Sequence, residues 1–312
     1  MESKFSIFKT SPLRIASRAS ELAIAQTKIV REGLKSVESI VCPITTRGDR
    51  IINRPLNELG GKGLFVKELE RSIITNKTDV AVHSMKDMET SFAQGTKIGA
   101  VLPREDRRDA LIGSYESLDV LPRGAKIGTA SVRRAAILLS YRPDLKIKLI
   151  RGNVNRRLAL LKAKEFDAIV LAVAGLKRLR LSIDYYPIDT SVMPSAAAQG
   201  AIAVQVAVPG CKRSNIVNEV INQLTCQQAL SEVTAERSFL ASLDGSCRTP
   251  VAASAVLCPT GHLTLDGMIL RPDGSASYRK QISGQRKDAM KLGEALGAEL
   301  LGLAGGKKFL AQ

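Results

Sequence analysis

Residues able to do chemistry follow directly after one short apolar run. The run 80–82 (Val-Ala-Val) predicts a strand that is buried on both faces. The polar residues after it are His83, Ser84, Lys86 and Asp87. They fall where the strand should end, and in open α/β sheets ligands bind beyond the carboxyl ends of the strands. A Lys beside an Asp can bind an anion and move a proton. Taken alone, the pair is equally compatible with a solvated turn.

A second candidate anion site lies near the N-terminus. Residues 13–18 predict a strand that runs into a helix, with Ser20 as the N-cap and Arg18 just before it. Free N–H groups at a helix start attract anions, and Arg18 would add a fork of donors. An ordinary cap without a ligand is the alternative. The helix is expected to pack through one apolar face, formed by Leu22, Ala25, Ile29 and Gly33.

Two loops follow in the first hundred residues. Residues 45–50 are expected to form a strand end and a mobile basic loop. Residues 60–63 (Gly-Gly-Lys-Gly) precede a helix with apolar residues at four-residue spacing. No Ser or Thr follows Lys62, so this is not a Walker A motif, and a flexible glycine lid is the preferred interpretation over a plain turn.

The same outline recurs after residue 125. Residues 126–134 again predict a strand, a small polar turn and an Arg-bearing helix start. A strand at 147–150 ends at Arg151 and precedes another basic helix start, and a buried strand at 167–173 leads to Arg178. Basic residues therefore recur at predicted strand ends and helix starts: Arg18, Lys62, Lys86, Arg133, Arg134, Arg151, Arg157 and Arg178.

This placement of basic residues indicates a ligand with many carboxylates. Arg predominates, and its planar fork suits bidentate binding of carboxylate or phosphate. Asp87 is the one acid in the set, so it would face a cationic centre that develops on a substrate.

Composition supports an anionic partner and disfavours nucleic acid. Lys plus Arg (46) exceed Asp plus Glu (30), which gives a net charge of +16 over 312 residues. Aromatic residues make up only 4%, there is no Trp, and no nucleic-acid-binding motif occurs. No apolar run approaches the ~20 residues of a membrane helix.

The cysteines indicate a reducing compartment. Five Cys without a C-x-x-C pair, and only two His, support neither a disulfide framework nor a zinc site. With no export signal, we expect a cytoplasmic location, or an organelle stroma after removal of a transit peptide. Cys247 lies between a Gly-Ser pair and Arg248, a setting typical of nucleophilic cysteines, whereas Cys42 and Cys258 fit inert thiols better.

Alternating strands and helices predict an α/β fold with more than one domain. Charged, Pro-marked residues 101–109 and small residues 193–200 are candidate hinge crossings. We therefore predict two periplasmic-binding-protein-like α/β domains joined by two hinge crossings, plus a small C-terminal α+β domain. The domains are expected at 1–102 with 201–218, at 106–194 and at 223–312. Basic strand ends of both α/β domains are expected to face a shared cleft.

Over nearly its whole length the sequence resembles the porphobilinogen deaminase (hydroxymethylbilane synthase) family. The motifs that carry the resemblance include Arg-Ile-Ala-Ser-Arg-Ala-Ser (14–20), Gly-Gly-Lys-Gly-Leu-Phe-Val-Lys-Glu-Leu (60–69), Val-His-Ser-Met-Lys-Asp (82–87), Gly-Thr-Ala-Ser-Val-Arg-Arg (128–134) and Leu-Asp-Gly-Ser-Cys-Arg-Thr-Pro (243–250). The resemblance implies condensation of four porphobilinogen molecules, with release of ammonia, on a covalent dipyrromethane primer. Hydrolysis then frees hydroxymethylbilane, and a monomer that binds neither nucleic acid nor membrane is implied.

The resemblance also assigns roles to residues. It implies that Asp87 is the catalytic acid and that Cys247 holds dipyrromethane through a thioether. The other residues implied in cofactor binding are Ser84, Lys86, Thr129, Ser131, Arg133, Arg134 and Arg157. Those implied in binding porphobilinogen and the growing polypyrrole are Arg18, Ser20, Gln26, Lys62, Arg151 and Arg178.

Three positions depart from the family pattern. Met88-Glu89 stands where an aliphatic residue and Pro are usual, Ala197-Ala198-Gln199 replaces Val-Gly-Gln, and Glu58 replaces a Lys found in some members. We expect less flexibility at 197–199 and one carboxylate contact fewer at Glu58. Two other functions were weighed: a non-catalytic two-lobed anion-binding protein, in which Cys247 would have no role, and a basic nucleic-acid-binding protein.

Overall fold

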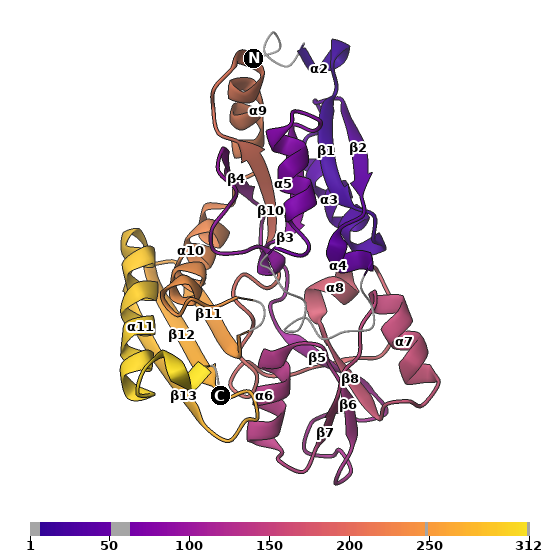
Figure 1. The fold of residues 1–312 in the computed structure, drawn as a ribbon, viewed down its shortest axis with the longest axis vertical. Helices are drawn as coiled ribbons and strands as arrows, with labels where there is room; N and C mark the ends of the chain where they lie inside the picture. The colour runs from indigo at the N-terminus through magenta and orange to yellow at the C-terminus, as the bar shows by residue number, and fades with distance from the viewer. Residues whose placement is uncertain (1–6, 51–62, 247–248, 311–312) are drawn as a thin grey trace. The chain divides into compact units, whose positions relative to one another are not determined.

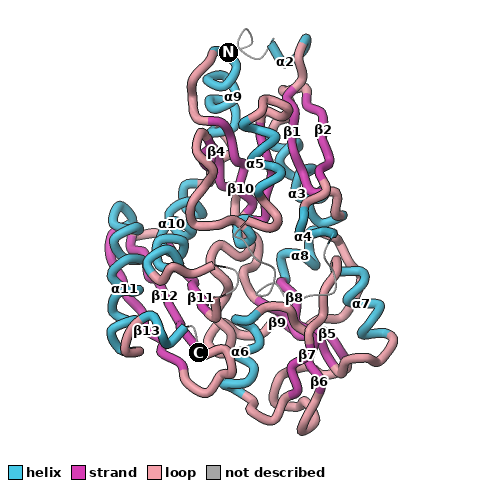
Figure 2. Tube along the Cα trace, viewed as in Figure 1, coloured by secondary structure: helices cyan, strands magenta, loops and turns pink. Residues whose placement is uncertain are grey.

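The structure is a computed structural model that describes residues 7–50, 63–246 and 249–310 (Figure 1). The described residues form three sheets, whose strands are magenta in Figure 2. The chain divides into two compact units. Of the described residues, unit 1 contains 7–50, 63–104 and 201–230, and unit 2 contains 105–200, 231–246 and 249–310. The chain thus leaves unit 1 near residue 104 and returns near residue 201.

The sheet of unit 1 has the strand order β2-β1-β3-β10-β4. Its strands are β1 (Leu13–Arg18), β2 (Ser39–Ile44), β3 (Val80–Ser84), β4 (Thr96–Val101) and β10 (Ile202–Ala207). β1 pairs in parallel with β2 and β3, whereas β10 runs antiparallel to both β3 and β4. The helices of this unit are α2 (Ile7–Thr10), α3 (Glu21–Gly33), α4 (Arg47–Arg50), α5 (Lys67–Ile74) and α9 (Lys212–Asn222).

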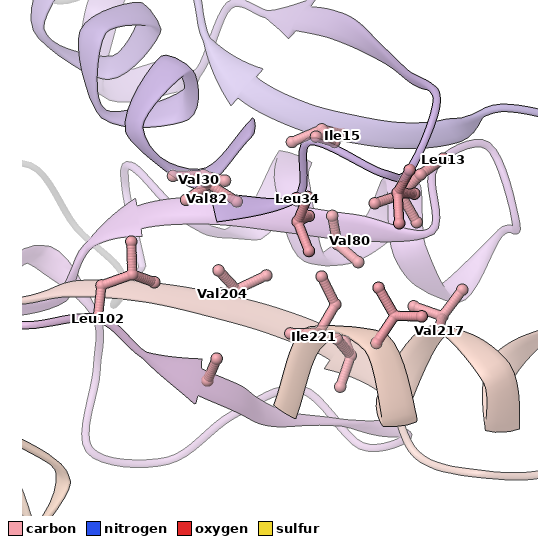
Figure 3. Packing of buried hydrophobic residues seen from close by; sticks show 14 of the residues in the cluster. Leu13, Ile15, Val30, Leu34, Val80, Val82, Leu102, Val204, Val217 and Ile221 are labelled. Carbon is pink, nitrogen blue, oxygen red and sulfur yellow. The ribbon is translucent and has the colours of Figure 1, made fainter. Parts of the chain in front are cut away.

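Strand β3 is buried on both faces, as the run 80–82 predicts. Val80 and Val82 pack in one cluster with residues of α3 and α9, among them Val30 and Ile221 (Figure 3). Ala81 points to the opposite face and joins the cluster that contains Leu69 of α5. Because successive strand residues alternate between faces, a strand covered on both sides needs a continuous apolar run.

Helix α3 packs through a different face from the one predicted. Its buried residues are Ala23, Gln26, Thr27 and Val30. Ile29 is exposed, and Leu22 and Ala25 are only partly buried. The prediction was wrong because two polar residues lie on the buried face. Thr27 Oγ1 donates to Ala23 O at 2.9 Å and lies 2.9 Å from Ser17 Oγ, so its hydroxyl is satisfied without water.

The second sheet, in unit 2, repeats this plan with the order β7-β6-β8-β5-β9. Its strands are β5 (Asp109–Gly113), β6 (Lys126–Gly128), β7 (Lys146–Lys148), β8 (Ala168–Ala172) and β9 (Tyr186–Pro187), and its helices are α6 (Val132–Tyr141), α7 (Val154–Lys162) and α8 (Val173–Arg178). β6 pairs in parallel with β7 and β8, and β5 runs antiparallel to β8. In each sheet one antiparallel strand lies beside the parallel strands: β10 beside β3 in unit 1, and β5 beside β8 in unit 2. Each of these two strands comes directly after the chain passes from one unit to the other, β5 after the passage near residue 104 and β10 after the passage near residue 201.

The C-terminal region forms a third, antiparallel sheet with the order β11-β12-β13. Its elements are β11 (Val251–Leu257), β12 (His262–Leu270), β13 (Ser277–Gln285), α10 (Gln227–Ser242) and α11 (Ala289–Leu303). The core combines Phe239 of α10 with Leu296 and Leu300 of α11 and inward residues of the strands. The predicted class, two α/β sheets and a small α+β domain, is confirmed. Among the described residues, no helix has the length and apolar composition to cross a membrane.

Candidate active site

Strand β3 delivers Asp87 through one tight turn. A short 3-10 helix, Met85–Asp87, follows Ser84 directly. Its backbone is fixed by Met85 N donating to Ala201 O and by Met88 N donating to Met85 O, each at 3.1 Å. Met85 and Met88 are buried, while the Asp87 side chain keeps 33% of its surface exposed. The carboxylate is therefore held on a rigid turn with access to solvent.

Ser84 is paired with Gln26 of α3. Gln26 Nε2 lies 2.7 Å from Ser84 Oγ, and the serine hydroxyl also lies 3.0 Å from Gln26 Oε1. Gln26 is buried and Ser84 is half-buried. This contact joins α3 to the start of the turn that carries Asp87, and it brings together two residues that were predicted to bind different ligands.

Arg18, the last residue of β1, is the cation nearest to Asp87 for which the structure gives a distance. Arg18 Nη1 lies 3.9 Å from Asp87 Oδ2. The Nε and Nη2 groups of Arg18 donate to Asp49, and its guanidinium carbon lies 4.4 Å from the centre of the Phe65 ring. Arg18 and Asp87, which the sequence analysis placed in one set of residues, thus approach each other in unit 1.

Ser20 caps α3, as predicted. Its side chain accepts from Ala23 N at 3.4 Å. Its hydroxyl is therefore partly used by the helix, and Ser20 retains lone pairs and its own proton for a ligand.

The loop after Asp87 is fixed by the two residues that depart from the family pattern. Met88 is buried, and Glu89 Oε1 accepts from Gly63 N at 2.8 Å. Gly63 has φ of +77°, which favours glycine. Glu89 therefore ties the turn that carries Asp87 to the segment before α5, a contact that a proline at this position could not make.

In unit 2, Thr129 and Ser131 build the start of α6. Ser131 caps the helix by accepting from Arg134 N at 3.4 Å, and Ser131 N donates to Thr129 Oγ1 at 3.1 Å. The strand, small polar turn and Arg-bearing helix start predicted for 126–134 are confirmed. Thr129 is buried and Ser131 is half-buried.

Arg133 and Arg134 are buried and share one carboxylate, that of Asp109. Arg133 Nη2 donates to Asp109 Oδ2 at 2.5 Å, and Arg134 Nη2 donates to Asp109 Oδ1 at 2.7 Å. Arg133 also donates to Pro194 O and Arg134 to Val170 O. Burial alone would raise the pKa of Asp109, but the two guanidinium groups hold that pKa far below its ordinary value. Much of their donor capacity serves the fold, and each retains N–H groups beyond these bonds.

The other three predicted arginines of unit 2, Arg151, Arg157 and Arg178, are only partly buried. Burial lowers the pKa of Arg151. Burial also lowers the pKa of Arg178 to about 10, although Glu105 acts in the opposite direction. Arg178 donates to Gly200 O at 2.5 Å and Arg157 Nε donates to Gly152 O at 3.0 Å. These cations are partly desolvated, so a carboxylate ligand would interact with them more strongly than with fully exposed ones.

Three predicted positions, Lys62, Cys247 and Glu58, lie outside the described residues. Two residues beside the site were missed by sequence reasoning, Asp49 and Asp109. Residues 47–50 were predicted to be a mobile loop, which was wrong, because they form the short helix α4. The sequence feature that could have indicated Asp49 is its position as the one acid between Arg47 and Arg50.

Comparisons with known proteins agree on one family. The description "Porphobilinogen deaminase, dipyromethane cofactor binding domain" matches residues 13–211, and "Porphobilinogen deaminase, C-terminal domain" matches residues 230–302. A porphobilinogen deaminase of Francisella tularensis subsp. holarctica is 41% identical over 298 residues, which cover 93% of this chain and 96% of that protein. One of Lysinibacillus sphaericus is 43% identical over 290 residues, which cover 90% of this chain and 91% of that protein.

Alignments with two solved structures have TM-scores below 0.5. An ancestral cationic amino acid solute binding protein aligns with a TM-score of 0.42 and 11% identity, over 71% of this chain and 93% of its own. The VFT2 domain of Bordetella pertussis BvgS aligns with a TM-score of 0.40 and 11% identity, over 72% of this chain and 91% of its own.

Proposed function

The chain belongs to the porphobilinogen deaminase family, and from this premise we propose which of its residues perform the reaction. The enzyme joins four porphobilinogen molecules head to tail with release of ammonia, and hydrolysis yields hydroxymethylbilane. The proposed machinery consists of one acid, one cysteine and a set of basic residues at strand ends and helix starts.

The cofactor of the family is dipyrromethane, and the donor set fits it. Dipyrromethane carries carboxylates and supplies the primer to which pyrrole units are joined. Half-buried hydroxyls and partly desolvated arginines are suited to bind carboxylates. We assign the attachment to Cys247 and the binding to Ser84, Lys86, Asp87, Thr129, Ser131, Arg133, Arg134 and Arg157.

Asp87 is the proposed catalytic acid. Each condensation expels an amine and leaves a positive charge conjugated to the pyrrole ring. Asp87 would protonate the leaving amine and then, as a carboxylate, stabilise that cation. The observation that carries this assignment is its place on the rigid turn after β3, partly exposed and 3.9 Å from Arg18.

The basic residues are proposed to bind the acetate and propionate groups of porphobilinogen and of the growing chain. The assigned basic residues are Arg18, Lys62, Arg151 and Arg178, and the neutral residues Ser20 and Gln26 are assigned to the same task. Arg151 and Arg178 are supported by their partial burial, which lowers the pKa of each without removing its charge at neutral pH. Buried Gln26 would act through its partner Ser84 rather than by direct contact.

Organisation and setting are also proposals. We infer three domains, at 1–102 with 201–218, at 106–194 and at 223–312, and a monomer in the cytoplasm that binds neither nucleic acid nor membrane. Four cysteines of the described residues are free thiols, which fits a reducing compartment.

Intact mass tests the attachment at Cys247. The wild-type protein is expected to weigh more than its sequence by one dipyrromethane. Cys247→Ser should have the mass of its sequence and no activity, while the matched control Cys258→Ser should keep both the added mass and the activity. Full activity of Cys247→Ser would refute the assignment.

A further inference from the structure

The guanidinium of Arg18 is fixed from two directions by residues to which no role has been assigned. Asp49 accepts from Nε and Nη2 of Arg18, with a distance of 3.3 Å from Nε to Oδ2. Phe65 lies against the face of the same group, 4.4 Å from its carbon atom to the ring centre. A bidentate bond and a ring contact together leave a guanidinium little freedom to rotate.

Asp49 is itself held firmly. Its Oδ2 accepts from Thr46 N at 3.1 Å and from Thr46 Oγ1 at 2.7 Å. Thr46 is fully buried, so these donors are part of the folded interior. Burial alone would raise the pKa of Asp49, but hydrogen bonds from Arg18 and Thr46 hold that pKa below its ordinary value. The carboxylate is therefore charged and rigid rather than a loose surface acid.

The bond to Asp49 uses only one edge of the arginine fork. A guanidinium has five N–H groups, and Asp49 takes the one on Nε and one on Nη2. Asp49 does not use the outer edge, formed by Nη1 and the second Nη2 hydrogen, and the Nη1 end of this edge approaches Asp87. The 3.9 Å from Nη1 to Asp87 Oδ2 is too long for a hydrogen bond. Asp49 thus leaves open the edge that could grip a ligand carboxylate in a bidentate manner.

Two carboxylates compete for this one cation. Without Asp49, Arg18 could turn by a small movement and form a bidentate pair with Asp87, which would occupy both the proposed acid and the binding fork. The bond to Asp49 opposes that movement because it holds the guanidinium at two nitrogens, whereas the approach to Asp87 involves one nitrogen at 3.9 Å.

We propose that Asp49 is a positioning residue for the condensation. It orients Arg18 so that the outer edge of the fork meets a substrate carboxylate, and it keeps Arg18 from pairing with Asp87. This inference rests on the proposed role of Arg18 in substrate binding.

A double-mutant cycle on the holoenzyme tests the inference. Asp49→Asn keeps the shape but removes the charge, and Arg18→Lys keeps the charge but removes the fork. Each single variant should lower kcat/KM for porphobilinogen about tenfold, since a misplaced binding group costs roughly this much or more. The double variant should fall within about twofold of Arg18→Lys, because a lysine has no fork to orient. Thr46→Val removes one of the two hydrogen bonds from Thr46 to Asp49 but keeps the charge of Asp49, so it should lower kcat/KM less than Asp49→Asn does.

The outcomes separate the two ideas. If the loss of kcat/KM in the double variant is the product of the two single losses, the inference is overturned. Equal losses of kcat/KM in Thr46→Val and Asp49→Asn would also overturn it. Either result would mean that Asp49 only stabilises the backbone at 46–49 and does not orient Arg18. An unchanged kcat/KM in Arg18→Lys would instead refute the proposed role of Arg18. Where a variant carries too little cofactor to be assayed, the loaded fraction read from intact mass replaces kcat/KM, and the same pattern is expected.

Discussion

Burial decides what each arginine of this protein can do. Arg133 and Arg134 have almost no exposed surface, and both share the carboxylate of Asp109, whereas Arg151 is only partly buried. The sequence places all of them alike, at strand ends or helix starts. It cannot show that Asp109, which lies 24 residues from Arg133 in the chain, takes up part of their hydrogen-bonding capacity.

The same substitution should therefore have two different effects. Arg133→Lys should destabilise the fold by roughly 2 kcal/mol, because one ammonium cannot reproduce planar bonds to both Asp109 and Pro194 O. Arg151→Lys should leave the melting temperature nearly unchanged and lower kcat/KM by about tenfold, through loss of bidentate carboxylate binding. Thermal unfolding and steady-state kinetics on both variants check this. Equal melting temperatures would contradict the structural role of Arg133, and wild-type kinetics of Arg151→Lys would remove its binding role.

His83, next to Ser84, should make the protein sensitive to acid. Burial lowers the pKa of His83 from 6.5 to about 4, and Gln205 acts in the opposite direction. The unfolded chain therefore binds a proton more readily than the folded one between these two values. Stability contributed by neutral His83 is fully present above pH 6.5 and is lost as the pH falls toward 4, by up to roughly 3 kcal/mol.

His83→Gln should flatten this dependence, since glutamine does not titrate. The free energy of unfolding, measured by denaturant titration from pH 7 to pH 4, should fall less steeply in His83→Gln than in wild type. His262→Gln, which changes the exposed second histidine, is the matched control and should keep the wild-type slope. An unchanged slope in His83→Gln would show that other groups cause the acid sensitivity.

At the scale of single elements, local pattern predicted strands better than helix faces. The strands at 80–82, 126–128 and 251–257 follow from apolar runs and turn residues, and all are present. The buried face of α3 was predicted wrongly because Gln26 and Thr27 are buried through hydrogen bonds to particular partners. Periodicity counts apolar residues, so it cannot detect a polar residue whose partner lies in another element.

The second crossing contains a strained alanine. Ala198 has φ of +59°, in the region that favours glycine, and its N–H donates to Glu236 Oε2 at 2.6 Å. An alanine in this conformation costs about 1 kcal/mol or more. The reduced flexibility expected at 197–199 stays a prediction. The strain at Ala198 can be tested separately, through the stability of a glycine variant.

Ala198→Gly should stabilise the protein by up to about 1 kcal/mol, because glycine adopts this conformation without strain. Ala197→Gly is the matched control, since Ala197 is not among the residues with positive φ and should lose stability through the greater freedom of glycine in the unfolded chain. Denaturant unfolding of both variants gives the comparison. A loss of stability in Ala198→Gly would mean that the conformation carries no strain.

At the scale of the whole molecule, the alternation of elements predicted the class of fold but not its pairings. Strand β10 lies beside β3, and Ile202 pairs with Ser84 more than a hundred residues away in the chain. Pairings of this kind depend on the two chain crossings, which a local pattern indicates only as small or charged segments. The contact of Asp49 with Arg18 is also non-local, because 31 residues separate the two in the chain, and no spacing in the sequence pointed to it.

The central claim is that Asp87, held on the turn after β3, supplies the charge that the reaction needs. Arg18 lies 3.9 Å from Asp87 and would repel a cation that develops on a substrate there, so that cation needs a carboxylate close by. Two unit charges ~4 Å apart interact by about 4 kcal/mol at an effective dielectric constant of ~20. Removing the charge of Asp87 should therefore affect chemistry far more than folding.

The most direct test is ammonia release in a single turnover by Asp87→Asn, Asp87→Glu and wild type, each first shown to fold and to bind porphobilinogen. Asp87→Asn should be slower than wild type by at least ~10²-fold, which a positioned acid typically supplies. Asp87→Glu should keep a fraction of the rate, and Glu89→Gln, which changes the neighbouring acid but keeps an acceptor for Gly63, should stay within about twofold of wild type. Release by Asp87→Asn at the wild-type rate would contradict the account, because Asp87 would then be structural.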